Sequence, residues 1–384
     1  MNILLHDNGK HLKFAPLTLT RPVGNLRMGM FTNNQRWEMY VPDAQISYVT
    51  EAYLSKKYPA VIKEDNFFVN AACIPSRDLV DKMQNLETGE AIFQGEEWIV
   101  FRGEHLSLDS AKQTQIEDVV VLEERWHLYQ KNAEVLAADF ATYTKGKSSE
   151  PLSATNTLIG DASQIFLEEG AVVEASILNV TSGPIYVGKD AEIMEGSVVR
   201  GALAMAEHSA LKLATKVYGP TSLGEHCKVG GEVNNVIFQA YSNKGHDGFL
   251  GNSLVGEWCN LGADTNSSNL KNNYGLVKAY SYETESIDAT DVQFMGVCMG
   301  DHSKCGINTM FNTATVIGVS ANVYGGDFPP KYIPSFAWGG SDGFVNFKLD
   351  KAFEVAENMM GRRSLVLTDE EREILGYIAD NFSH

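Results

Sequence analysis

The strongest constraint in this sequence is a six-residue repeat in the second half of the chain. Every sixth position from Val187 carries a methionine or an aliphatic side chain, at Val187, Ile193, Val199, Met205, Leu211, Val217, Leu223 and Val229. The residues four places further on are small or β-branched with one exception: Ala191, Ser197, Leu203, Ser209, Thr215, Thr221, Cys227 and Val233. A short, fixed period indicates an architecture in which one small unit is stacked many times.

This repeat predicts a left-handed parallel β-helix that runs from about Ile159 to Tyr324. Each unit of six residues would form one short strand and one turn, and three units would close a triangular coil whose aliphatic corner stacks on the next. An ordinary β-sandwich with an accidental period is the alternative. The phase breaks near Asn234, so we expect the polar segment Gln239–Gly248 to project as a loop. Beyond Pro330, amphipathic helices are expected over Leu349–Met360 and Thr368–Phe382, with Thr368 as a helix cap.

Residues 1–152 follow a different pattern, in which strand-like apolar runs alternate with helical segments. Such alternation favours an α/β sheet with ligands at the carboxyl ends of its strands. The expected strands are Asn2–Leu5, Ile46–Val49, Phe67–Cys73 and Glu97–Phe101, and the expected helices are Gln35–Tyr40, Glu51–Lys57, Ser76–Leu86 and Glu124–Asp139. The predicted organisation is thus a short Rossmann-like α/β domain (1–152), a left-handed parallel β-helix (153–345) and a helical tail (346–384).

Charge and cysteine content narrow the classes of function. The chain has 49 acidic against 31 basic residues, a net charge of −18, which argues against nucleic acids and anionic membranes as partners. Five scattered cysteines without a CxxC pair, no signal peptide and no long apolar run predict a cytoplasmic protein with reduced thiols. The first 30 residues are an exception, because Lys10, Lys13, Arg21 and Arg27 face only Asp7 there. Either this basic cluster binds phosphate or its members are solvated surface charges.

The segment Pro16–Gly29, PLTLTRPVGNLRMG, resembles the opening of sugar-phosphate nucleotidyltransferases. The family's glycine-rich loop is reduced here to Asn8–His11, Val23 stands in place of the usual lysine, and Val69–Ala72 lacks the metal-binding aspartate. The resemblance implies that Lys10, Arg21 and Arg27 hold phosphates of a nucleoside triphosphate and a sugar 1-phosphate, with Mg²⁺ assisting. It assigns no metal ligand.

A second resemblance lies in the repeat region. The runs HDGFLG (His246–Gly251) and NLGA (Asn260–Ala263), followed by Asn269, are similar to the acetyltransferase half of the bifunctional, hexapeptide-repeat family that makes UDP-N-acetylglucosamine. The resemblance implies that His246 is the catalytic base, Asn260 a positioning group and Asn269 a contact of acetyl-CoA. It also places Glu232 and Phe249 at the sugar, with acetyl-CoA bound between subunits of a homotrimer.

Other interpretations of the same residues stay open. A single histidine is more often structural than catalytic, and Asn260 and Asn269 also fit an asparagine ladder at the turns of the coil. The family's lysine near the sugar site is Asn234 here, and Lys244 could compensate for the missing charge.

Together these observations predict a transferase of sugar-nucleotide and cell-envelope biosynthesis. It would combine a sugar-1-phosphate nucleotidyltransferase, of UDP-N-acetylglucosamine or dTDP-glucose type, with an N-acetyltransferase acting on a hexosamine phosphate. The alternatives are an enzyme that keeps one of the two activities, and a catalytically degenerate trimer that binds nucleotide sugars as a scaffold or regulator.

Overall fold

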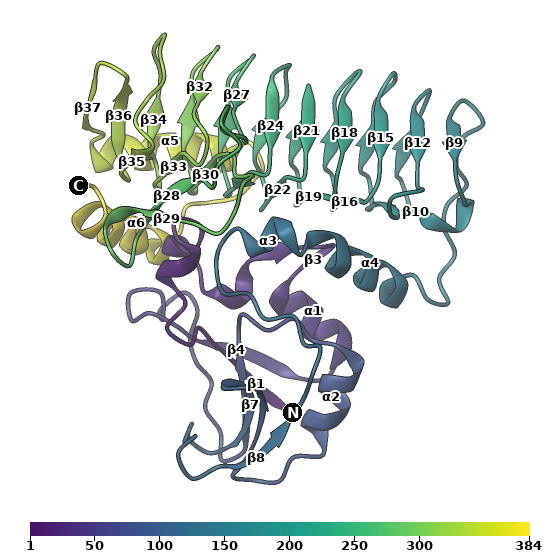
Figure 1. The fold of residues 1–384 in the computed structure, drawn as a ribbon, viewed down its shortest axis with the longest axis vertical. Coiled ribbons are helices and arrows are strands. Elements are labelled where there is room, and N and C mark those ends of the chain that lie inside the picture. The colour runs from purple at the N-terminus through teal and green to yellow at the C-terminus, as the bar shows by residue number, and fades with distance from the viewer.

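The computed structural model describes residues 1–384 as two bodies joined along one side (Figure 1). A long solenoid of short strands forms the upper body, and an α/β domain made from the N-terminal residues lies beneath it. The C-terminal helices lie beside the late coils of the solenoid. The predicted fold class is confirmed: an α/β domain is followed by a left-handed parallel β-helix and a helical tail.

The solenoid is a three-sided prism, and each side is a parallel sheet. The docked sheet, which faces the N-terminal domain, has nine strands: β10 (Ile165–Leu167), β13 (Ile185–Val187), β16 (Leu203–Met205), β19 (Thr221–Leu223), β22 (Ile237–Phe238), β25 (Leu254–Val255), β30 (Cys298–Met299), β33 (Val316–Ile317) and β35 (Tyr332–Ile333). The cavity sheet, named for the site described below, has ten: β11 (Val172–Val173), β14 (Glu192–Ile193), β17 (Ala210–Leu211), β20 (Lys228–Val229), β23 (Asn243–Lys244), β26 (Asn260–Leu261), β31 (Lys304–Cys305), β34 (Asn322–Val323), β36 (Ala337–Gly340) and the antiparallel β37 (Gly343–Asn346).

The third side, the open sheet, carries exposed side chains along most of its length. Its strands are β9 (Thr157–Ile159), β12 (Ile177–Asn179), β15 (Val198–Arg200), β18 (Lys216–Tyr218), β21 (Glu232–Asn234) and β24 (Phe249–Gly251), and a separate pair, β27 (Asn266–Ser267) and β32 (Met310–Phe311), follows β24.

The side chains of the six-residue repeat fill the inside of this prism. All eight aliphatic positions from Val187 to Val229 are buried in a single core of 33 residues, and their eight companions are buried as well. Hydroxyls among the companions are satisfied locally, since Ser209 and Thr215 each donate to the carbonyl oxygen three residues earlier, at 2.6 and 2.5 Å. A small polar residue is therefore tolerated in the core because the turn itself supplies its acceptor.

The prediction of a projecting loop at Gln239–Gly248 is wrong. This segment stays inside the coil, where β22 and β23 pair with their neighbours in register. The segment that does project follows β27 and carries the hairpin of β28 (Lys278–Ser281) and β29 (Ser286–Ala289). The phase breaks because this coil is shorter than those before it: Met205 pairs with Leu223, 18 residues later, whereas Leu223 pairs with Phe238, only 15 residues later. In the shortened coil Lys244 takes the inward position next to Val229.

The N-terminal domain is built on a mixed six-stranded sheet with the order β4-β1-β5-β7-β6-β8. Strands β1, β4 and β5 are parallel, as a Rossmann-like half requires, and β7 adds to β5 in the antiparallel sense. The strands are β1 (Asn2–His6), β4 (Gln45–Val49), β5 (Asn66–Asn70), β6 (Glu90–Gln94), β7 (Glu97–Gly103) and β8 (Lys112–Gln115), with a small ribbon of β2 (Arg27–Met28) and β3 (Phe31–Thr32).

Four helices accompany this sheet: α1 (Asn33–Tyr40), α2 (Arg77–Gln84), α3 (His127–Gln130) and α4 (Asn132–Tyr143), with short 3-10 turns at Leu12–Phe14, Leu17–Thr20 and Val23–Asn25. The helix expected over Glu51–Lys57 is a series of turns instead. Pro59 follows it and disfavours helix extension. Tyr53 in this segment stacks on Tyr377 of the tail, with ring centroids 4.1 Å apart.

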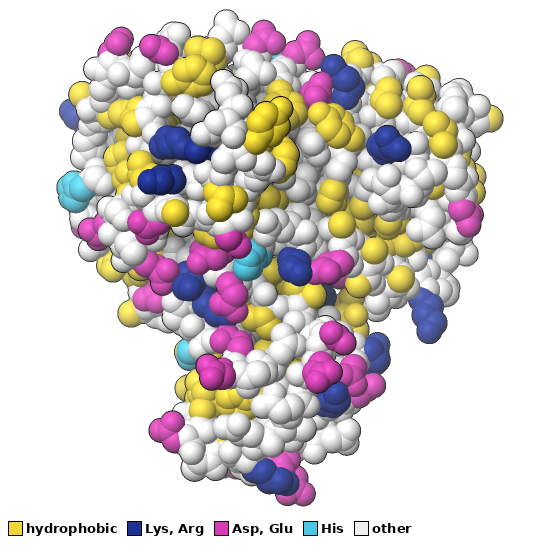
Figure 2. All heavy atoms as spheres, in the orientation of Figure 1, with side chains coloured by type: hydrophobic (Ala, Val, Ile, Leu, Met, Phe, Trp, Pro, Cys, Tyr) yellow, Lys and Arg dark blue, Asp and Glu magenta, His cyan; other side chains and the backbone are white.

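The domain is docked on the solenoid rather than tethered by a linker. Outward side chains of the docked sheet, including Ile237, Leu254 and Cys298, belong to the same hydrophobic core as β1 and β5. Further along, Leu136 and Phe140 of α4 pack on Phe166 and Tyr186. Acidic and basic side chains gather where the narrow lower body meets the broad upper one (Figure 2).

The tail consists of the two expected helices, α5 (Leu349–Gly361) and α6 (Asp369–Asn381). Thr368 caps α6 in a capping box with Glu371, as the sequence indicated. Both helices bury apolar residues, among them Ala356 and Ile378, against the late coils and the Leu17–Thr20 turn. None of the helices is long and apolar enough to cross a membrane.

Candidate functional site

A large cavity lies between the cavity sheet and helix α5. Its volume is about 870 Å³, and we call it the tail cavity. Two of the residues singled out from the sequence, His246 and Asn260, both line it. The remaining walls are formed by Lys212, Lys228, Tyr241, Asn243, Gly245, Trp258, Leu261, Gly262, Ala263, Lys304, Ile307, Val355, Asn358, Met359, Arg362 and Arg363.

Charge in the tail cavity is entirely positive. Lys212, Lys228, Lys304, Arg362 and Arg363 line it together with no Asp or Glu. None of these five side chains forms an ion pair with a carboxylate, although the chain as a whole carries a net charge of −18. Burial and then the nearby charges of Arg363, Lys212 and Arg362 lower the pKa of Lys228, and burial lowers the pKa of Lys304 to about 8. This arrangement is that of a site for an anion.

One edge of the tail cavity is formed by a column of stacked aromatic rings. Tyr241 and Trp258 are nearly parallel, with centroids 4.2 Å apart, and both line the cavity. The column continues through His226 to His208 on one side and to His302 on the other. Each of these rings belongs to a residue that occupies a turn of the coil and has a positive φ. Equivalent turns of successive coils lie next to one another, so the stacking is a product of the coil's repeat.

The other residues expected at the acyl-transfer site lie around the corner of the prism. Glu232 and Phe249 are register partners on the open sheet, where Glu232 accepts a hydrogen bond from the Tyr218 hydroxyl at 2.7 Å. Asn269 donates to Asn252 at 2.8 Å, beside Phe249. The structure thus divides the expected set between two faces, with His246 at the turn that joins them.

Lys244 does not face a ligand. It is fully buried, and its ammonium group donates to the carbonyl oxygens of Gly230, His246 and Asp247 at 3.1, 2.7 and 2.9 Å. Burial lowers its pKa to about 8. The lysine therefore fixes the backbone that carries His246 and does not supply charge to a sugar phosphate.

We expect Lys244→Met to lower the free energy of unfolding by about 1–3 kcal/mol, because methionine fills the same space but leaves three carbonyl oxygens without their donor. Chemical denaturation measures this. Lys216→Met, which removes an exposed lysine of the open sheet, is the control and should change stability by less than about 0.5 kcal/mol. Equal stability of the two variants would show that the buried ammonium does not hold the turn.

The three basic residues that were expected to hold phosphates, Lys10, Arg21 and Arg27, are each engaged by carboxylates. Lys10 binds Glu97 and Glu123 at 2.7 and 2.8 Å. Arg21 is 4% exposed and its guanidinium group binds Glu257 and Asp301 of the solenoid. Arg27 binds both oxygens of Glu225 at 2.7 Å and exchanges hydrogen bonds with Gln239. The structure thus uses Arg21 and Arg27 between domains, and their role in binding phosphate stays a prediction.

A second cavity of about 490 Å³ opens beside Lys10 in the N-terminal domain. Its lining includes Glu97, Asp118, Glu123, Lys131 and Glu134, so it is mainly acidic. One oxygen of Glu97 already accepts hydrogen bonds from Asn70 and Asn8 at 2.6 and 3.1 Å, in addition to its contact with Lys10. These carboxylates do not converge into a group of three, and we derive no step through a Mg²⁺ ion there.

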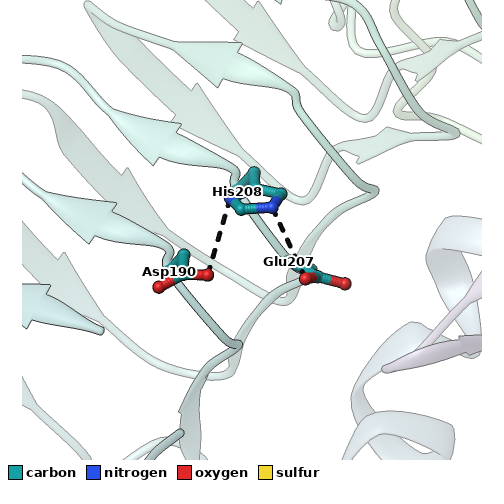
Figure 3. Close-up of side chains that lie close together, drawn as sticks. All are labelled: Asp190, Glu207 and His208. Carbon is teal, nitrogen blue, oxygen red and sulfur yellow. Dashed lines mark ion pairs between the residues drawn. The ribbon is translucent and has the colours of Figure 1, made fainter. Parts of the chain in front are cut away.

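A single cluster in the chain brings three metal-ligating side chains together, at Asp190, Glu207 and His208 (Figure 3). All three are exposed. Asp190 lies 3.9 Å from Nδ1 of His208 and Glu207 lies 3.5 Å from Nε2, so the two carboxylates face different nitrogens of the ring. One ligand atom from each side chain lies within 4.8 Å of the others, but exposed acidic groups of this kind are common without an ion, and we assign no metal here.

The sequence missed the cations and the aromatic column of the tail cavity. Lys228, Asn243, Asn260 and Lys304 are successive register partners on the cavity sheet, and the coil spacing could have aligned them. No comparable signal was available for Arg362 and Arg363, because only the packing of α5 on the solenoid brings them to this face.

The comparisons with known proteins agree with this division into two bodies. A family model described as "Sugar nucleotidyl transferase" matches residues 3–148. The chain is 24% identical over 150 residues to a "Bifunctional protein GlmU" of Trichodesmium erythraeum, covering 38% of this chain and 27% of that protein. It is 22% identical over 148 residues to a "Putative uncharacterized acetyltransferase YaiX" of Escherichia coli, covering 38% of this chain and 64% of the relative.

Among solved structures, an Arabidopsis UDP-N-acetylglucosamine acyltransferase aligns with 57% of this chain and 85% of its own, at 14% identity and a TM-score of 0.25. The chain spans about a quarter of the length of the first curated relative and about two thirds of the second. The N-terminal domain is therefore sugar-nucleotidyltransferase-like, and the relatives of the chain are transferases.

Proposed function

We propose that the solenoid is an acyltransferase, which moves an acetyl group from acetyl-CoA to the amine of a hexosamine phosphate. The observation that carries this proposal is the convergence of His246 and Asn260 on one cavity lined by five cations without a carboxylate. Such a lining fits a phosphate-bearing acyl donor.

The chemistry required of the chain is modest. Acetyl-CoA supplies an activated thioester, whose C–S bond breaks as the C–N bond of the amide forms. His246 is exposed on a turn held by Lys244, where its imidazole can take the proton that the attacking amine loses and return it to the departing sulfur. Asn260 lies on the neighbouring strand of the same wall and positions the reactants by hydrogen bonding.

The acceptor would approach from the other side of His246. Glu232, Phe249 and Asn269 lie together there on the open sheet, and their position supports a role at the sugar. This arrangement lets donor and acceptor reach one imidazole from two faces of the prism.

Thiol release tests the proposal directly. Purified protein with acetyl-CoA and glucosamine 1-phosphate should release free thiol, and the product should contain a new N-acetyl group by mass spectrometry. Release that does not depend on an amino sugar would indicate hydrolysis. Tight binding of nucleotide sugars without any turnover would support the scaffold or regulator instead.

A second activity, nucleotidyl transfer, is favoured by the family match over residues 3–148. The cavity beside Lys10, near the end of β1, is where this domain would act. A nucleoside triphosphate and a sugar 1-phosphate should then release pyrophosphate in the same preparation. If no such pair releases pyrophosphate, the domain has lost the reaction and the chain keeps the solenoid activity alone.

A further inference from the structure

The tail cavity has a feature that neither the repeat nor the family match accounts for. Two of its five cations, Arg362 and Arg363, come from the end of α5 rather than from the solenoid. They close the wall opposite Lys212 and Lys228, so one chain supplies cations from both sides of the cavity.

The packing of α5 fixes these arginines in place. Ala352, Ala356 and Met360 are buried in one cluster with Phe336 and Phe347 of the last coils. Val355 and Met359, which lie on a neighbouring face of the same helix, line the cavity itself. The helix therefore ends with its two guanidinium groups at the cavity, and their position depends on apolar packing and not on any carboxylate.

The cations of the tail cavity have no negative charge among them. The pKa of Lys228 is lowered by burial and then by Arg363, Lys212 and Arg362, which means that the four cations repel one another. Like charges held together without a partner cost free energy unless an anion is bound between them. The cost would be unnecessary on an ordinary surface, where Lys and Arg pair with the abundant acidic residues of this chain.

We propose that Arg362 and Arg363 of the tail, with Lys212 and Lys228 of the solenoid, form an intrachain clamp for the phosphates of a nucleotide-bearing ligand. Guanidinium groups bind phosphate oxygens in pairs, and two of them with two ammonium groups match a ligand that carries several phosphate charges. Tyr241 and Trp258 line the same cavity, but their ring faces are occupied by one another and by His226 and His302, so they give the ligand an apolar wall and not a stacking surface. The clamp makes the tail a determinant of ligand selectivity.

This inference deepens the proposed acyl transfer, and two ligands share its chemistry. In acyl-CoA the phosphates would be the 3′-phosphate and the diphosphate, and in a nucleotide sugar they would be the diphosphate alone. Calorimetric titration of the full-length protein with CoA, dephospho-CoA and UDP-N-acetylglucosamine distinguishes them. A preference for CoA over dephospho-CoA identifies the first source, and binding of the nucleotide sugar alone identifies the second.

The decisive variant is Arg362→Glu/Arg363→Glu, titrated with the ligand that binds wild type most tightly. We expect the dissociation constant to rise about 30-fold or more, because two charge-assisted contacts are lost and reversed. Binding to wild type should also weaken with added salt. Lys351→Glu is the matched control, since it reverses an exposed charge on the same helix outside the cavity, and it should bind within about threefold of wild type.

The outcomes separate this inference from the proposed function. Unchanged affinity in the double variant overturns the clamp, even if acetyl transfer proceeds. Failure of CoA, dephospho-CoA and UDP-N-acetylglucosamine to bind wild type overturns it as well. Arginine-dependent binding without any acetyl transfer supports the clamp while rejecting the proposed reaction. Melting curves of both variants establish that α5 is still folded.

Discussion

Replacing Arg21 with alanine is expected to reduce the free energy of unfolding by about 3–5 kcal/mol. The side chain crosses from the N-terminal domain to two carboxylates of the solenoid, Glu257 and Asp301, and Asp301 is only 4% exposed on its side chain. Alanine would leave both carboxylates without a cation in a site where water enters poorly. Thr20 still donates to Asp301 at 2.7 Å, but a hydroxyl does not neutralise a charge.

Chemical denaturation followed by fluorescence and circular dichroism measures this loss. Arg102→Ala is the matched control, because Arg102 forms an exposed ion pair with Asp65 within the same domain and should cost about 1 kcal/mol or less. Adding Glu257→Gln and Asp301→Asn to Arg21→Ala should recover part of the loss, since the stranded charges are then removed. If Arg21→Ala and Arg102→Ala are equally stable, the buried contact does not secure the docking.

His246→Ala is expected to lower kcat for acetyl transfer by about 10²- to 10⁴-fold, the range typical of a lost general base. The KM for acetyl-CoA should stay within about threefold, because the cations of the tail cavity are untouched. The side chain is exposed, so its removal should leave the melting temperature unchanged. Thiol release and amide formation are measured together, to separate transfer from hydrolysis.

His105→Ala provides the control for this variant, as it removes another exposed histidine that lies in the N-terminal domain. It should retain wild-type kcat for acetyl transfer. A His246→Ala enzyme that transfers acetyl groups within threefold of the wild-type rate would assign the base to another residue. Pyrophosphate release should be unaffected in both variants.

The repeat predicted the solenoid well because every sixth residue occupies an equivalent inward position of the coil. An inward position must fill the corner, and Val187, Leu211 and Val229 do so directly. Prediction failed after Asn234, where the coil is shorter and the six-residue frame no longer falls on inward positions. One of the shifted inward positions is Lys244, which places its stem in the core and its ammonium group against three carbonyl oxygens. Hydrophobic periodicity cannot register a polar group that is satisfied by the backbone.

The candidate site was predictable only in part, for a related reason. His246 and Asn260 were found because a family motif carries them, and the coil then brings both to one cavity. Arg21 and Arg27 were interpreted as phosphate ligands because a basic run next to a first strand looks the same whether its partner is a nucleotide or a carboxylate. Glu225, Glu257 and Asp301 lie more than 190 residues away in sequence, and only the docking of the two bodies shows that they face these arginines.

The solenoid has three sides, and other segments of the same chain cover one of them and part of a second. The docked sheet is covered by the N-terminal domain, and part of the cavity sheet by α5, so a further copy of the chain would find those surfaces taken. On the open sheet, Ile177 and Val198 are adjacent register partners, and Ile159 and Tyr218 lie in the neighbouring row of the same sheet. Each of these four apolar side chains is between 38% and 44% exposed. If three copies assemble, as the family resemblance implies, we expect their symmetry axis to lie on the side of the open sheet, because neither the N-terminal domain nor α5 covers that side. The docked domains would then point outward, like blades around a common hub.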